Sequence, residues 1–136
     1  MNQTLNQYQP WGLLIGRILL AYMFVLSGFG KIFSFAGTAG YMASKGMPMA
    51  EFFLVCAILI ELVGGLMLAV GWKARWGALA IAVFLVPTTL IFHAYWTYPE
   101  AQVTMQQIQF NKNLTILGGM LYVLFTGPGR LSLDKA

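Results

Sequence analysis

The feature that most constrains this chain is an apolar run at residues 52–72 with one acidic residue at its centre. The run reads FFLVCAILIELVGGLMLAVGW, and every one of its 21 residues except Glu61 is apolar or small. At a helical rise of about 1.5 Å per residue, such a run spans the hydrocarbon core of a bilayer, about 30 Å thick. A carboxylate at that depth is costly unless it is protonated or paired. We therefore expect Glu61 to face protein or water and not lipid.

Two roles fit a buried glutamate of this kind. It is either a structural residue bonded to an adjacent helix or part of a polar site inside a helix bundle. Gly64 and Gly65 follow about one turn later and allow a neighbouring helix to approach closely. The second role is favoured because three more polar residues lie in the other apolar runs of the chain.

The composition places the chain in a membrane. Hydrophobic residues make up 59% of the 136 residues and charged residues 9%, whereas a soluble domain has about 25% charged residues. The net charge of +4 comes from single Lys and Arg residues at the ends of apolar runs, as in the positive-inside rule. This pattern argues for a lipid bilayer as the main partner and against nucleic acid.

The few reactive side chains exclude several classes of redox site. A single cysteine, Cys56, excludes an intrachain disulfide and a Cys-x-x-Cys exchange site. A single histidine, His93, excludes a haem held by two histidines, and no cluster of metal ligands is present. We expect no metal site, and no catalytic or cofactor motif that is sufficient by itself is evident.

The chain is predicted to be a single all-α membrane domain over residues 1–136, a four-transmembrane-helix bundle. The spans are expected at about residues 11–33, 52–72, 76–96 and 105–126, with a short surface helix between the first two. Pro10 suits the start of the first helix. The last apolar run, residues 114–126, is too short to span alone, so its helix is expected to begin earlier, near Tyr98.

The first predicted polar site is buried and joins Arg17 to Glu61. If both helices cross fully, the two residues are offset by roughly 9 Å along the bundle axis. Two extended side chains cover that distance directly or through one water. Such a pair also explains how two charges are tolerated in lipid.

A second predicted site lies nearer the outer interface and contains Lys31, His93 and Asn113. We expect it to bind a carbonyl or anionic group. A helix beginning near Tyr98 also places Gln102, Gln106 and Gln109 on one stripe with Asn113. That stripe either lines a cleft at the membrane surface or is an ordinary solvated helix end.

The distribution of positive charge predicts that both termini lie in the cytoplasm. Five cations belong to the side of the termini and three to the other side; they are Arg17, Lys73, Arg75, Arg130 and Lys135 against Lys31, Lys45 and Lys112. The larger number marks the cytoplasmic side under the positive-inside rule.

Several short motifs together resemble the DoxX family of small four-helix membrane proteins. They are Arg17 with SGFGK at 27–31, ELVGG at 61–65, the turn at 71–75, FHAYW at 92–96, FNKNL at 110–114, and TGPG with LSLD at 126–134. The last three narrow the resemblance to the YphA/YqjF type of inner-membrane protein. The resemblance covers about residues 13–134.

The resemblance implies a membrane component of an oxidoreductase system in the bacterial inner membrane. Relatives in the family are linked to quinone-coupled thiosulfate oxidation, or to complexes with a sulfurtransferase and a superoxide dismutase. No cofactor is evident in the residues themselves, and the resemblance is compatible with a quinone-binding or anchoring subunit, because a quinone needs only an apolar slot and one or two hydrogen-bonding groups. Redox partner proteins or a homo-oligomer are the expected protein partners.

Two other classes of function remain open. Glu61 suits a proton relay in a transporter or channel for protons or a small solute. The glycine-rich helix faces equally suit a structural scaffold that docks another membrane protein.

Overall fold

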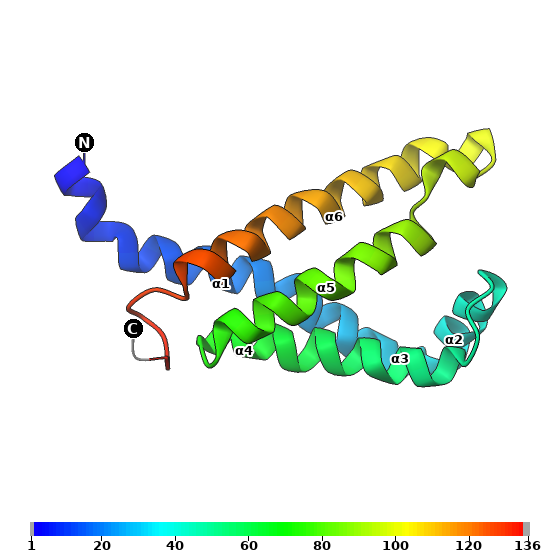
Figure 1. Ribbon diagram of the computed structural model, residues 1–136, viewed down its shortest axis with the longest axis horizontal. Coiled ribbons are helices and arrows are strands. Elements are labelled where there is room, and N and C mark those ends of the chain that lie inside the picture. Colours follow the sequence, from blue (N-terminus) through cyan, green and yellow to red (C-terminus); the bar gives the residue numbers. More distant parts are fainter. Residues whose placement is uncertain (1, 135–136) are drawn as a thin grey trace.

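The computed structural model describes residues 2–134, and all regular elements in that range are helical (Figure 1). The first two helices are α1 (Asn2–Phe33) and α2 (Phe35–Ser44). A continuous helical segment follows, made of α3 (Ala50–Leu59), the π-helix η1 (Ile60–Gly64) and α4 (Gly65–Val70). Then come α5 (Ala74–Phe92), the short 3₁₀ helix η2 (Tyr95–Thr97) and α6 (Glu100–Thr126). The predicted all-α class and the short helix after the first span are confirmed.

The long helices alternate in direction. α1 and α5 run one way, and the α3–α4 segment and α6 run the other way (Figure 1). α1 packs against η1 and α4, and α5 packs against both that segment and α6. Short connections between the helices make each one antiparallel to the next. Helix α2 lies at the end of the molecule opposite to the two termini (Figure 1).

Three helices are long and apolar enough to cross a membrane, judged by length and composition. They occupy Gln3–Phe33, Ala50–Val70 and Ala74–Thr97. Helix α6 has 27 residues, but the polar stripe in its first half lowers its hydropathy, so the predicted fourth span stays a prediction. Its second half is suited to lipid, because Tyr122 and Phe125 are each 76% exposed.

The first helix begins earlier than the sequence indicated. Pro10 was expected at the start of the helix, but α1 begins at Asn2 and contains Pro10. A proline inside a helix removes one backbone hydrogen bond and bends the axis. The ribbon of α1 is bent in this first part (Figure 1).

Glycines set the spacing between the central helices. A Cβ placed on Gly65 would lie 2.9 Å from Val25 Cγ2, and one on Gly77 would lie 2.9 Å from the carbonyl oxygen of Gly64. Such distances leave no room for a methyl group, so the backbones meet directly, as in small-residue interfaces of membrane helices. The close approach expected at Gly64 and Gly65 is confirmed, and it brings α1 against the Glu61 segment.

Candidate functional site

The site is built where the second span changes its helical geometry. Residues Ile60–Gly64 form a π-helix between α3 and α4, and Glu61 lies in it. A π-helical turn has hydrogen bonds from residue i to i+5 and inserts one extra residue, which changes the direction of the side chains beside it. Such turns occur frequently at functional sites. Nothing in the periodicity of residues 52–72 indicated this turn.

Glu61 is paired with Lys31 and not with Arg17. Lys31 Nζ lies 2.9 Å from Glu61 Oε2 and donates a hydrogen bond of 3.0 Å to Oε1. Ser27 Oγ donates to the same Oε1 at 3.1 Å and accepts from Lys31 Nζ at 2.5 Å. The Glu61 side chain is only 6% exposed, and that of Lys31 is 25% exposed. Lys31 is therefore turned into the protein, one helical turn from Ser27 on the same face of α1.

One oxygen of Glu61 retains acceptor capacity. Oε2 is buried and in ionic contact with Lys31 Nζ, but no group within residues 2–134 directs a hydrogen bond to it. Lys31 Nζ forms its hydrogen bonds with Oε1 and with Ser27 Oγ, and its contact with Oε2 is ionic. A buried carboxylate oxygen in this state gains free energy from any further donor that reaches it.

The predicted Arg17–Glu61 pair is wrong. Arg17 is 3% exposed and donates to the carbonyl oxygens of Ala69, Pro128 and Leu131, with Nη2–Leu131 O at 2.8 Å. The reason is the register of two antiparallel helices. Gly28 packs against the Cβ of Glu61, and Arg17 lies 11 residues before Gly28, about 16 Å along the helix. The prediction took the midpoints of both helices as level, whereas the glycine contacts set a different offset.

Glu61 and the residues of the predicted outer site line one cavity, and Arg17 is not among its lining residues. This cavity of about 150 Å³ is lined by twelve residues. Seven of them are polar, namely Ser27, Lys31, Glu61, Thr88, His93, Lys112 and Asn113, and five are apolar, namely Met23, Phe24, Phe84, Leu85 and Ile116. Lys31, His93 and Asn113 were predicted together in an outer site, and the structure brings them to Glu61. Ser27, Thr88 and Lys112 were not predicted as site residues, although Ser27 precedes Lys31 by one helical turn.

Helix α6 supplies the polar wall opposite Glu61. His93 Nδ1 lies 2.8 Å from Gln106 Oε1, and Lys112 Nζ donates to Gln109 Oε1. Asn113 is 7% exposed, and its Nδ2 donates to Thr89 Oγ1 at 3.0 Å. Part of the predicted glutamine stripe therefore holds the side chains that line the cavity.

Two tyrosines hold the surface helix over the end of α5. The hydroxyls of Tyr41 and Tyr98 lie 3.3 Å apart, and Tyr98 donates to the carbonyl oxygen of Phe92 at 2.7 Å. Burial, together with the contact to Tyr98, raises the pKa of Tyr41 to about 12. Burial acts the same way on Tyr98, but the neighbouring Lys45 and Tyr41 outweigh it and lower the pKa of Tyr98.

The C-terminal tail forms a second polar assembly at the other end of the molecule. Asp134 Oδ1 accepts from the backbone N–H of Lys73 at 2.7 Å, and Oδ2 accepts from that of Ala74 at 3.0 Å. The backbone N–H groups of Leu133 and Asp134 donate to the carbonyl oxygens of Val70 and Gly71. The tail therefore packs over the turn between α4 and α5. Arg17 also binds the tail, through the carbonyl oxygens of Pro128 and Leu131.

Comparison with known proteins identifies the family of the chain. The family profile of DoxX matches residues 12–94. The chain belongs to the DoxX family. It is 40% identical over 131 residues to the inner membrane protein YqjF of Escherichia coli K12, covering 96% of this chain and 95% of that protein. It is 35% identical over 127 residues to the inner membrane protein YphA of the same organism, covering 93% and 91%.

This DoxX chain is also similar, at lower identity, to eukaryotic proteins. The ER-derived vesicles protein ERV29 of Saccharomyces cerevisiae is 24% identical over 135 residues, which is 99% of this chain but 36% of ERV29. No solved structure gives a significant match. The resemblance to DoxX proteins predicted from the motifs is confirmed, and the chain is a membrane protein whose near relatives are inner membrane proteins.

Proposed function

We propose that this DoxX protein is a membrane component of a redox system in the bacterial inner membrane and binds a quinone-type head group at the Glu61 cavity. The proposal rests mainly on Glu61 Oε2, a buried acceptor without a directed hydrogen bond in a cavity that also contains His93 and Lys112. Polar groups in most buried sites use up their hydrogen-bonding capacity on one another, so remaining capacity favours a ligand.

The donor and acceptor set suits a group that alternates between carbonyl and hydroxyl. Because an amide oxygen only accepts, the 2.8 Å contact of His93 Nδ1 with Gln106 Oε1 requires a hydrogen on Nδ1. Nε2 of a neutral His93 is then an acceptor. Lys112 uses one N–H on Gln109 and has two others. A quinone carbonyl accepts from Lys112, and the hydroxyl of the reduced form donates to His93 Nε2 or Glu61 Oε2.

The size of the cavity limits the ligand. About 150 Å³ accommodates a single six-membered ring, since an apolar cavity of about that volume binds benzene. Met23 lines the cavity and is 45% exposed on the outer face of α1. The lipophilic side chain of a bound quinone is therefore able to extend from the cavity into the lipid. A quinone supplies two-electron, two-proton chemistry when bound, and the residues of this chain orient its head group and hold a proton beside it.

Binding of a short-chain quinone to the purified protein tests the proposal. Isothermal titration in detergent should show binding by the wild type that falls about tenfold or more in Glu61→Gln and His93→Ala, because each variant loses a hydrogen-bond partner. Glu51→Gln makes the same charge change at the exposed start of α3 and should bind like the wild type. Melting temperatures of all variants identify any that fail to fold. Absence of binding by the folded wild type would overturn the proposal.

A second candidate function is a proton relay, and the Lys31–Glu61 pair favours it. Ionisable pairs within membrane-spanning helices mark proton and ion pathways, and this pair lies in α1 and the second span. Liposomes that contain only this protein and a pH-sensitive dye would then show a proton flux that Glu61→Gln removes and Glu51→Gln retains. Proton flux through a protein that binds no quinone would favour the proton relay over the quinone-binding function.

A further inference from the structure

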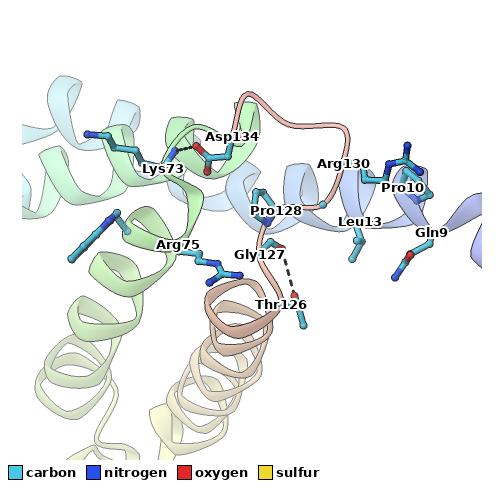
Figure 2. A pocket seen from close by; sticks show the side chains of 12 residues that line it. Gln9, Pro10, Leu13, Lys73, Arg75, Thr126, Gly127, Pro128, Arg130 and Asp134 are labelled. Atoms are coloured by element: carbon cyan, nitrogen blue, oxygen red, sulfur yellow. Dashed lines mark hydrogen bonds between the residues drawn. The ribbon is translucent and has the colours of Figure 1, made fainter. Parts of the chain in front are cut away.

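A second and larger pocket lies between the C-terminal tail, residues 9–13 of α1 and the first turn of α5. Its volume is about 600 Å³. Its walls come from three parts of the chain that are far apart in sequence, represented by Leu13, Arg75 and Arg130 (Figure 2). This pocket lies at the end of the molecule that carries the termini and so is separate from the Glu61 cavity.

The pocket carries an excess of positive charge. Lys73, Arg75 and Arg130 line it, and Asp134 is the one carboxylate among the lining residues. Both oxygens of Asp134 already accept backbone N–H groups at the start of α5. Within residues 2–134, none of the three cations has a carboxylate oxygen within ion-pair distance, since the ion pair found there is Lys31–Glu61.

Arg75 is positioned by the geometry of the chain after α6. A Cβ on Gly127 would lie 3.2 Å from Arg75 Nη2 and 3.4 Å from its Nε. Gly127 also has φ +85°, which disfavours other residues. Figure 2 shows Arg75 extending from α5 toward the end of α6 beside Thr126 and Gly127, while Arg130 lies across the tail near Pro10. Both arginines line the pocket, and in that view their guanidinium groups lie apart, Arg75 beside the end of α6 and Arg130 beside Pro10.

The surroundings place this charge at a membrane interface. Helix α5 begins at Ala74 and helix α6 ends at Thr126, and both of these helix ends lie next to the pocket. Leu13 and Trp76 form an apolar part of its wall, and tryptophan is enriched at the level of lipid head groups. Basic pockets between spanning helices at this level suit phosphate-bearing head groups, and arginine binds phosphate oxygens in a bidentate manner.

We propose that this pocket binds a phosphate group, and that the phosphate is the head group of an anionic phospholipid. Arg75 and Arg130 bind the phosphate oxygens, and the acyl chains lie along the apolar wall. Lys73 adds charge at the rim, where its Nζ rests 5.3 Å from the centre of the Trp72 ring. This site is independent of the quinone proposal, because no residue lines both pockets.

Native mass spectrometry of protein purified with equal amounts of phosphatidylglycerol and phosphatidylcholine tests the site. We expect one retained phosphatidylglycerol per chain. Arg75→Gln and Arg130→Gln should each weaken retention about fivefold, since a cation near an anionic membrane contributes about that factor. Lys45→Gln removes the same charge near α2, at the other end, and should retain the lipid. Arg130 is exposed and makes no side-chain hydrogen bond within residues 2–134, so its variant should fold even if Arg75→Gln does not.

Three results would overturn the lipid assignment. One is equal retention of the two lipids by the wild type. Another is an equal loss of bound phosphatidylglycerol in Lys45→Gln and Arg130→Gln, which would indicate a general effect of protein charge. The third is displacement of the lipid by millimolar inorganic phosphate, which would assign the same phosphate chemistry to a soluble ligand.

Discussion

Lys31 Nζ lies 2.9 Å from Glu61 Oε2, and this contact is the one ion pair within residues 2–134. It joins the end of α1 to the π-helix in the second span. Because the two charges neutralise one another, a carboxylate and an ammonium are tolerated at a depth where either alone is costly. Because Oε2 can accept a further hydrogen bond, a ligand with a donor group can bind to the same pair.

The pair should be energetically coupled. Lys31→Met or Glu61→Gln should each lower stability, at the lower end of the roughly 3–5 kcal/mol typical of a broken buried pair, because Lys31 is 25% exposed. The double variant should lose less than the sum. Melting and denaturant unfolding in one detergent measure this coupling. Arg17→Met combined with Glu61→Gln is the control and should be additive, since no contact joins those residues; coupling there would contradict the register described above.

Arg17 should control the order of the C-terminal tail. Its guanidinium donates to carbonyl oxygens on α4 and in the tail, and lysine cannot reproduce that fork of donors. In Arg17→Lys we expect the amides of Leu133 and Asp134, which donate to Val70 and Gly71, to exchange their hydrogens about tenfold faster or more. Hydrogen exchange read by mass spectrometry measures this. Unchanged exchange in a folded variant would mean that the backbone contacts hold the tail without Arg17.

Gly28 should be intolerant of a methyl group, and Gly30 is its matched control. A Cβ on Gly28 would lie 2.8 Å from Leu62 Cγ and 3.1 Å from Glu61 Cβ, whereas one on Gly30 meets nothing within 4 Å. Gly28→Ala should destabilise the protein by about 1–3 kcal/mol through overpacking. Gly30→Ala should be neutral or stabilising by up to about 1 kcal/mol through its helix propensity. Equal melting temperatures for the two variants would argue against the close contact of α1 with η1.

The termini should lie in the cytoplasm and α6 should cross the membrane. The charge bias motivates the orientation, although Lys135, one of its five cations, lies outside the described residues. In a Cys56→Ala background, an impermeant thiol reagent should label Ser44→Cys in intact cells, but Thr4→Cys and Arg130→Cys only after permeabilisation. Labelling of Thr4→Cys in intact cells would reverse the orientation. Labelling of Arg130→Cys but not Thr4→Cys would exclude the fourth span.

The helical type of the elements and the approximate positions of the spans could be predicted from the local pattern of the sequence. The apolar run around Glu61 predicted the α3–α4 segment to within two residues at each end, because length and hydropathy are properties of consecutive residues. Gly71 and Gly127 end helices with positive φ, as glycines after apolar runs commonly do. The start of α1 was missed because Pro10 is compatible with both a helix start and a bent helix interior.

The partners of the buried charges did not follow from local pattern. The apolar run around Glu61 was enough to indicate that this residue faces protein or water and is either protonated or paired, since a lone carboxylate in lipid is costly. The packing of the helices against one another makes Lys31 the partner of Glu61 and brings Arg17 against the tail. The physical reason is register: the glycines at positions 28 and 65 set the offset of two antiparallel helices through contacts between distant residues. A shift of a few residues in that offset would give every buried charge a different partner.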